Sequence, residues 1–323
     1  MSYLRILTGT CAIAAFASAC HRPMPADDDH MAHMAAGDLA LPVPSNPNNL
    51  QGHAGIPASA NTAPARLAAS PRHAEWVKIA WEPGSSDSLM AWIVYPTTSN
   101  PKTPVVVVVH EVYGLQTWVR GVADQVAADG FIAIAPDLLS RVRGGPTTTE
   151  LPGPDAQKLI SGVNSAERVK GIAAAARYAM SQPSAAQKYG VIGFCWGGQT
   201  MWMEATNGGI LGYSGSVAFY GLPYMTGPIP NADSLAKIKV PMMLLSGAKD
   251  ARIGAGMPGV DSAMKADGKS YYGHNYDGAV HGFMRAQDDP KATPDPAEEK
   301  ANLTAAEDAW PRTIAFLKKN LGM

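Results

Sequence analysis

Five consecutive valines, Val105 to Val109, run directly into His110. A strand with one face in water alternates apolar and polar residues, whereas this run has no polar position before the histidine. Such a run is typical of a strand that is buried on both faces, as in parallel sheets covered by helices. The pattern predicts a layered fold with the valine strand inside it.

Strand-like and helix-like segments alternate along the chain beyond about residue 73. Further strands are expected at Glu75–Trp81, Leu89–Tyr95, Phe131–Ala135, Tyr189–Gly193, Tyr213–Tyr220, Pro241–Ser246 and Tyr271–Tyr276. Helices are expected at Trp118–Asp129, Ala166–Met180, Gly197–Thr206 and Ala305–Asn320. This alternation predicts one α/β domain, a mostly parallel sheet with helices on both faces.

The composition is consistent with one large globular domain. Of the 323 residues, 46% are hydrophobic and 16% are charged. The formal net charge is -1, so no overall field favours nucleic acid or an anionic membrane, and nucleic acid is not an expected partner.

Residues 1–20 have the pattern of an export signal. Arg5 is the only positive charge, and an apolar run from Ile6 to Phe16 is too short to span a bilayer. The small residues at 17–19 fit an ordinary cleavage site, but small residues before Cys20 also resemble a lipobox. An exported protein is expected, periplasmic or lipid-anchored to the bacterial envelope at Cys20.

Residues 21–72 are rich in Pro, Ala, Asn and Gly and show little periodicity. They are expected to form a flexible tether, with the catalytic domain at 73–323. The tether contains a loose set of soft metal ligands, Met24, His30, Met31, His33 and Met34. Their spacing matches no closed metal site, so no metal is expected.

The sharpest local signal is Gly193-Phe194-Cys195-Trp196-Gly197, between an expected strand and an expected helix. This is the nucleophile-elbow pattern with sulfur in place of the usual serine oxygen. Small residues two positions either side allow a tight turn, and the amides at the helix N-terminus favour thiolate over thiol. The alternative is a glycine-rich turn in which Cys195 merely packs.

A nucleophile needs a base, and the base needs a group that orients it. Asp250 follows the strand that ends at Ser246, and His281 lies between the last strand and the final helix. Alone, each has an ordinary explanation: a helix-capping aspartate and a surface or core histidine. Their order after Cys195 is the order of this triad in α/β-hydrolases.

Two other chemistries are excluded by spacing. His110-Glu111 would need histidine where Gly114 stands to form the H-E-x-x-H zinc motif. The chain contains neither a G-x-G-x-x-G fingerprint after a strand nor a phosphate-binding G-x-x-x-x-G-K-[ST]. No cofactor is expected.

Five separated segments resemble the dienelactone hydrolase family, over about Glu75 to Leu321. They are His110-Glu111-Val112-Tyr113-Gly114, Pro136-Asp137-Leu138-Leu139-Ser140-Arg141, Gly193-Phe194-Cys195-Trp196-Gly197-Gly198, Asp250, and His281-Gly282-Phe283-Met284-Arg285. The resemblance implies an α/β-hydrolase fold and a carboxymethylenebutenolidase-like enzyme that cleaves esters or lactones.

The resemblance also implies roles for single residues. Cys195, Asp250 and His281 would form the triad, while Glu111 would hold a resting neutral thiol and take its proton as substrate arrives. The backbone N–H groups of Val112 and Trp196 would form the oxyanion hole. A simpler alternative for Glu111 is an ion pair with a nearby arginine.

The resemblance assigns the substrate carboxylate to Arg141 and Arg285. A guanidinium suits that bidentate task, and the alternative for either arginine is a solvated loop residue or a structural ion-pair partner. Tyr113, Trp118 and Trp196 are candidates for apolar pocket walls, although core packing explains such aromatics equally well. Residues 143–154 look like a flexible loop beside the pocket.

The leading hypothesis is therefore an exported hydrolase of small esters or lactones that works through a thioacyl-enzyme. A general esterase, thioesterase or peptidase on the same triad stays open. A non-catalytic envelope binding protein is the alternative from another class, although such a protein has no need of Glu111, Cys195, Asp250 and His281 together. The oligomeric state is not indicated by any pattern in the sequence.

Overall fold

A computed structural model of the chain describes residues 52–98, 102–147, 153–287 and 295–323. The expected leader, Cys20 and the histidines and methionines of the tether lie outside these ranges. Among the described helices, none combines the length and apolar character that a membrane crossing requires.

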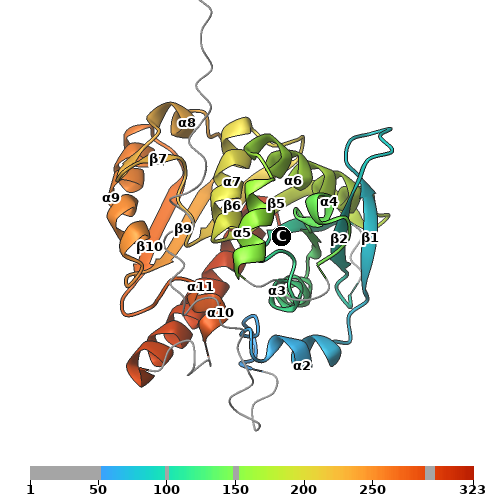
Figure 1. Cartoon of the computed structure of the whole chain (residues 1–323), viewed down its shortest axis with the longest axis horizontal. Coiled ribbons are helices and arrows are strands. Elements are labelled where there is room, and N and C mark those ends of the chain that lie inside the picture. Colours follow the sequence, from blue (N-terminus) through green and yellow to red (C-terminus); the bar gives the residue numbers. More distant parts are fainter. Residues whose placement is uncertain (1–51, 99–101, 148–152, 288–294) are drawn as a thin grey trace, which may run out of the picture.

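The core of the protein is an eight-stranded sheet in the order β1-β2-β4-β3-β5-β6-β9-β10 (Figure 1). Its strands are β1 (Ala74–Ala80), β2 (Ser88–Val94), β3 (Thr103–Val109), β4 (Ile132–Pro136), β5 (Ala185–Phe194), β6 (Tyr213–Phe219), β9 (Met242–Gly247) and β10 (Tyr271–Tyr276). β2 runs antiparallel to β1 and β4, and all other neighbours are parallel. The mostly parallel sheet predicted from the sequence is confirmed. β3, the valine strand, is fully buried.

Helices cover both faces of this sheet. α6 (Ser165–Met180) and α7 (Trp196–Asn207) pack on each other and on β3, β5 and neighbouring strands. α3 (Thr117–Ala128) and α11 (Pro296–Leu321) lie together in the lower half of Figure 1, linked by a 2.9 Å hydrogen bond from the Trp310 indole to Asp129. A capping box between Asn164 and Glu167 fixes the start of α6.

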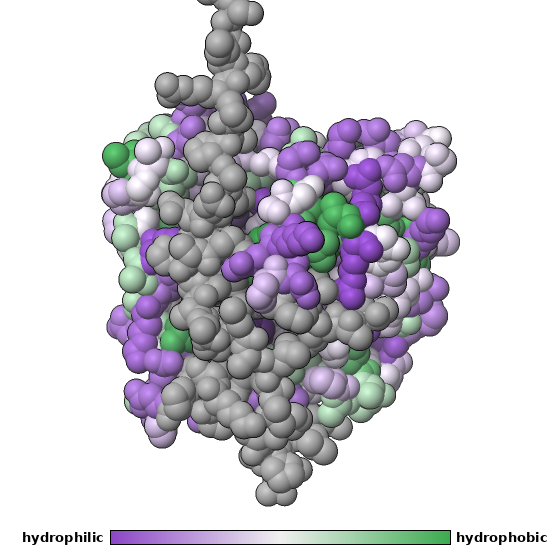
Figure 2. Space-filling view, in the orientation of Figure 1, coloured by the Kyte–Doolittle hydropathy of each residue, from purple (hydrophilic) through white to green (hydrophobic). Residues whose placement is uncertain are grey.

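The remaining helices and a short hairpin complete the described fold. They are α2 (Ala63–Ala68), α4 (Ser140–Arg143), α5 (Gly153–Ser161), α8 (Ala232–Ala236), α9 (Ala251–Ala266), α10 (Phe283–Ala286) and the hairpin β7 (Met225–Thr226) and β8 (Ile229–Pro230). On the face seen in Figure 2, the described side chains are mostly hydrophilic, with a small hydrophobic patch near α4 and α5. Val142 of α4 is one of the few large apolar residues that are exposed.

The predicted strands and helices are found within a few residues of their expected bounds, with two differences. α11 begins at Pro296 rather than near Ala305, because Asp295 caps it and proline is compatible with a first helical turn. The stretch 143–154, predicted as a flexible loop, contains the end of α4 and the start of α5, while 148–152 lie outside the described residues.

The predicted tether is wrong for residues 53–72. This segment contains α2 and has nearly complete burial of Ile56, Ala58, Ser59 and Ala63. Small side chains allow the close approach: a Cβ on Gly121 of α3 would stand 3.4 Å from the Cβ of Ala63. A six-residue helix is too short to show a helical period, so the sequence pattern looked irregular.

A buried carboxyl group in α7 gives a testable pH dependence of stability. Glu204 is fully buried and accepts a 2.8 Å hydrogen bond from the Tyr189 hydroxyl. Burial raises the pKa of Glu204 to about 7 from an ordinary 4.5. Between these two values the unfolded chain has released the proton and the folded chain has kept it, so stability falls as the pH rises.

We therefore expect the free energy of unfolding of the wild type to fall by roughly 2 to 3 kcal/mol between pH 5 and pH 8 relative to Glu204→Gln. Urea unfolding at both pH values measures the difference. Glu307→Gln, at an exposed position of α11, is the matched control and should follow the wild type. Parallel curves for Glu204→Gln and the wild type would contradict this account.

Candidate active site

Cys195 occupies a strained turn between β5 and α7. Its backbone has φ 54° and ψ -114°, a left-handed conformation that non-glycine residues rarely adopt. The turn is held on both sides, because the Cys195 N–H donates to the Phe219 carbonyl and its own carbonyl accepts from the Gln199 N–H, both at 3.0 Å. A strained strand-to-helix turn of this kind is the nucleophile elbow of α/β-hydrolases.

Two glycines let the elbow approach its neighbours. A Cβ on Gly193 would stand 2.2 Å from the Gly197 carbonyl oxygen, and one on Gly197 would stand 2.4 Å from the Val109 carbonyl oxygen. The start of α7 therefore rests directly on the end of β3. This contact brings the loop that carries Glu111 and Val112 to the side of Cys195.

Asp250 and His281 meet at the same edge of the sheet, since both follow the carboxyl ends of parallel strands. The His281 Nδ1 atom lies 2.5 Å from Asp250 Oδ2. The other oxygen, Oδ1, accepts the N–H of Ile253 at 3.1 Å and so caps α9. Asp250 is therefore both a helix cap and the partner of His281. In the sequence these two roles had been alternatives.

A side-chain hydrogen bond joins His281 to Cys195. All three residues that the sequence placed in a triad are thus brought together in one chain of contacts. Burial works against a charged His281, but the Cys195 thiolate and the bond to Asp250 outweigh it and raise the pKa of His281 to about 10. Burial similarly opposes ionisation of Asp250, yet the hydrogen bond from His281 keeps its pKa below the ordinary value. These effects favour an imidazolium beside the Asp250 carboxylate.

Glu111 lies opposite Arg285 in the same region. Arg285 Nε is 3.1 Å from Glu111 Oε2, and both side chains are almost completely buried. The Arg285 guanidinium is also 5.9 Å from the centre of the Tyr113 ring. Glu111 therefore forms the ion pair that the sequence had left open as an alternative to contact with the thiol.

Arg141 is not brought to this group of residues by any described contact. Its guanidinium pairs with Asp87 and, at 3.3 Å, with Glu167, and it lies 4.0 Å from the centre of the Trp81 ring. These partners belong to the β1–β2 turn and α6. This is the structural ion-pair alternative, and it does not support the expected pairing of Arg141 with Arg285 around one substrate carboxylate.

Tyr220 also lies at the site, although it was not predicted from the sequence. This residue follows β6, has φ 40° and is fully buried, with its ring 4.9 Å from that of His281. Burial and the nearby Glu111 charge raise its pKa well above the ordinary value. Tyr220 lies at the site because β6 is the neighbour of β5 in the sheet. The order of the strands cannot be read from the sequence, so no local pattern pointed to this residue.

His110 makes hydrogen bonds that hold the loop containing Glu111 in place. Its Nδ1 lies 2.6 Å from the Glu111 carbonyl oxygen, and its Nε2 accepts the Leu138 N–H at 3.0 Å. The ring stacks on Trp196 at 5.5 Å, and burial lowers the pKa of His110. A neutral His110 therefore fixes the backbone beside Glu111. Among the described residues, no group of three or more His, Cys, Asp or Glu is arranged to hold a metal ion.

The comparison with protein-family models decides the family. The model of the dienelactone hydrolase family matches residues 89–321. The chain belongs to the dienelactone hydrolase family. This confirms the family predicted from the five motifs and, with it, the α/β-hydrolase fold.

Curated relatives are 26% to 28% identical to this chain over the aligned residues. An Escherichia coli protein named "Putative carboxymethylenebutenolidase" is 26% identical over 246 residues, which cover 73% of this chain and 84% of that protein. A Salmonella typhimurium protein of the same name is 28% identical over 179 residues, 53% of this chain. That match spans only 64% of the Salmonella protein.

Solved structures show the same fold. A Klebsiella pneumoniae protein named "Putative Dienelactone Hydrolase" aligns with a TM-score of 0.62 and 25% identity, covering 76% of this chain and 98% of that one. A dienelactone hydrolase-like promiscuous phosphotriesterase from metagenomic libraries aligns with a TM-score of 0.59 and 21% identity, covering 76% and 98%. At 21% identity, the second likeness concerns the fold alone.

Proposed function

We propose that the protein hydrolyses small esters or lactones through a thioacyl-enzyme on Cys195. The observation that carries the proposal is the chain of contacts from Cys195 through His281 to Asp250. Cys195 has a φ of 54° in a strand-to-helix turn, as expected for the nucleophile elbow of an α/β-hydrolase. A nucleophile, a base and an orienting carboxylate in this order are the parts that acyl transfer requires.

In the proposed reaction the Cys195 thiolate attacks the carbonyl carbon, and a C–S bond forms. The C–O bond to the leaving alkoxide then breaks, and the alkoxide takes a proton from the His281 imidazolium. A water next gives its proton to His281 and attacks the thioester, which releases a carboxylic acid product and regenerates the thiolate. With a lactone, the alkoxide and the acid are two ends of one product.

Two backbone N–H groups are suited to the oxyanion of the tetrahedral intermediate. Trp196 is the first residue of α7, so its N–H lies at a helix N-terminus beside the nucleophile. Val112 lies in the loop after β3, which the elbow glycines bring against α7. Donors of this kind typically contribute about 3 to 4 kcal/mol each to the transition state.

Cys195 bonds to His281, and Glu111 faces Arg285. A substrate carboxylate that binds Arg285 would compete with Glu111 for the guanidinium. The freed Glu111 carboxylate would then lie beside the reacting groups, which keeps a role for it in activation.

The raised pKa of His281 predicts the upper limb of the pH profile. We expect ester turnover to fall as the pH rises through about 10, where His281 loses the proton that the alkoxide needs. The turnover number is measured on a neutral ester between pH 7 and pH 11, with the rate of uncatalysed hydrolysis subtracted. Turnover that stays constant over this range would contradict the role of His281 as proton donor.

The substrate prediction follows from the different positions of the two arginines. Arg285→Met should lower kcat/KM for a carboxylate-bearing lactone by about 10- to 100-fold more than for a neutral ester, the effect of losing a charge-assisted bond. Arg141→Met should change the two substrates equally, since its guanidinium is already paired with Asp87 and Glu167. If Arg285→Met lowered kcat/KM equally for the lactone and for the neutral ester, as Arg141→Met is expected to do, this would contradict an anionic substrate.

The proposed function itself is tested with a short substrate panel. A dienelactone, neutral p-nitrophenyl esters and a peptide amide are incubated with the leaderless protein, and quenched samples are analysed by peptide mass spectrometry. Turnover of an ester or lactone with an acyl adduct on Cys195 supports a thioacyl-enzyme. Cleavage of the amide alone would favour a peptidase on the same triad. No turnover by folded protein would favour a binding protein.

The location of this activity is also a proposal. The leader pattern at residues 1–20 supports an exported enzyme in the periplasm or bound to the envelope through Cys20. Mass spectrometry of the N-terminus of the mature protein from a bacterial host separates a free residue after cleavage from a lipid-modified Cys20.

A further inference from the structure

Residues 53–72 form a segment that we call the N-terminal strap. It precedes the region 89–321 that matches the family model. Its helix α2 lies beside α3 at the lower edge of the molecule (Figure 1). Ile56, Ala58 and Ser59 on the strap are almost fully buried. The strap is therefore part of the packed domain.

The strap forms hydrogen bonds both to α3 and to the segment that carries Arg285. The Ala58 carbonyl accepts the Trp118 indole N–H of α3 at 3.0 Å. Two residues later, the Ala60 N–H donates to the Arg285 carbonyl of α10, also at 3.0 Å. The Pro57 carbonyl accepts the side-chain amide of Gln287 at 2.9 Å. One short stretch of backbone thus ties α3 to the segment that carries Arg285.

Both tied elements reach the proposed site. Trp118 packs edge-on against Phe194 at 5.0 Å, and Phe194 is the residue before Cys195. Arg285 is the partner of Glu111. α10 has only four residues and begins at Phe283, two residues after His281, so it has little helical structure of its own to hold Arg285 in place.

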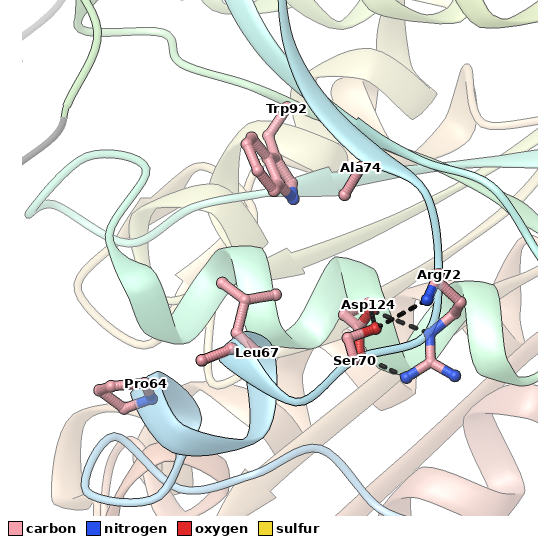
Figure 3. A pocket seen from close by; sticks show the side chains of 8 residues that line it. Pro64, Leu67, Ser70, Arg72, Ala74, Trp92 and Asp124 are labelled. Carbon is pink, nitrogen blue, oxygen red and sulfur yellow. Dashed lines mark hydrogen bonds and ion pairs between the residues drawn. The ribbon is translucent and has the colours of Figure 1, made fainter.

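The remainder of the strap is anchored to α3 and to the strap itself, since Arg66 donates to Gln125 of α3 and to the Ile56 carbonyl. Arg72 pairs with Asp124 of α3 at 2.5 Å, and Ser70 donates to the same carboxylate. Between this ion pair and α2, a cleft of about 360 Å³ separates Leu67 from Trp92 (Figure 3). The hydrogen bonds described between the strap and the segment that carries Arg285 come from residues 57–60.

We propose that the N-terminal strap is a positioning element of the active site, which holds α10 against α3 so that Arg285 receives the substrate carboxylate. The proposal rests on the proposed function for its substrate. In this account the strap contributes to recognition of anionic substrates by fixing the backbone of Arg285, and it does not touch the substrate itself.

The test uses point variants in the full chain. Gln287→Met removes the donor to Pro57 and keeps the side-chain length, and Trp118→Phe removes the donor to Ala58 and keeps an aromatic ring on Phe194. Arg72→Met is the matched control, because it breaks the ion pair with Asp124 at the far end of the strap. For each variant, kcat and KM are measured on a carboxylate-bearing lactone and on a neutral ester, together with the thermal midpoint.

We expect both strap variants to raise KM for the anionic lactone about tenfold, while KM for the neutral ester changes less than about twofold. Arg72→Met should lower the thermal midpoint and leave the ratio of the two KM values unchanged. A purely structural strap would lower the thermal midpoint in all three variants without any change in the ratio, and this outcome would overturn the proposal. Should Trp118→Phe fail to fold, Gln287→Met decides.

A second readout separates failure of the strap proposal from failure of the proposed hydrolysis. Cys195 is alkylated in parallel by iodoacetate, which carries a carboxylate, and by iodoacetamide, which does not. The rate ratio reports whether Arg285 attracts an anion to the thiol, whatever the true substrate is. A ratio that falls about tenfold in Gln287→Met supports the strap even if no tested ester is hydrolysed. An unchanged ratio in an enzyme that hydrolyses esters would overturn the strap and leave the hydrolase.

Discussion

Cys195→Ala is expected to lower kcat/KM for any hydrolysed ester by at least about 10⁴-fold, to the residual level that oxyanion donors and binding provide in hydrolases without their nucleophile. The side chain is 3% exposed and makes the bond to His281, and alanine offers no atom that can form an acyl-enzyme. The measurement is steady-state hydrolysis of the best panel substrate, with active-site concentration fixed by protein absorbance.

Two controls distinguish loss of the nucleophile from loss of the fold. The thermal midpoint of Cys195→Ala should stay near that of the wild type, because alanine tolerates the φ of 54° about as well as cysteine does. Removal of the thiolate should also lower the pKa of His281 from about 10, which an NMR titration of the imidazole detects. Retention of more than a tenth of the activity would mean that the nucleophile is another residue.

Gly193→Ala is expected to abolish folding or to destabilise the protein by more than about 4 kcal/mol. The new Cβ would stand 2.2 Å from the Gly197 carbonyl oxygen and 2.9 Å from the Gly198 nitrogen. Both atoms belong to the backbone of α7, so no side chain can rotate away. Relief requires that α7 separates from β5, which would also dismantle the elbow. Urea unfolding, or the soluble yield if no folded protein is obtained, measures the effect.

Gly145→Ala is the matched control for this substitution. A Cβ there would meet no heavy atom within 4 Å, and its φ lies outside the left-handed region. We expect a change of less than about 1 kcal/mol, in the stabilising direction, because alanine restricts the unfolded chain. Similar stabilities of the two alanine variants would show that α7 adapts to the clash and that the tight elbow is not required for folding.

The sheet and the triad could be predicted because each has a strong local pattern. The valines of β3 and the alternating segments that follow identify strands without knowledge of their neighbours. The elbow is specified by Gly193, Cys195 and Gly197 within five residues. Asp250 and His281 were found by their order behind Cys195, and their contact then follows from parallel strands that end at one edge.

The missed elements depend on contacts between distant residues. α9 contains Gly254, Gly256 and Pro258, residues that disfavour a helix, and it is held by Asp250 at its first turn. The strap shows no period because single residues, rather than a face, contact α3 and α10. Arg141 matches the family motif, yet Asp87, 54 residues before it, determines where its guanidinium lies. No local pattern in the sequence predicts these contacts between distant residues.

The two oxygens of Asp250 connect helix stability to catalysis. One oxygen caps α9 and the other orients His281, so the carboxylate can keep its angle toward the imidazole only while the first turn of α9 is formed. This helix has poor intrinsic propensity, and local fraying of its end requires less free energy than global unfolding. Mild heat or denaturant should therefore inactivate the enzyme before its circular dichroism changes. Substitutions that strengthen the first turn of α9 offer a route to an enzyme that stays active at higher temperature without any change in the catalytic residues.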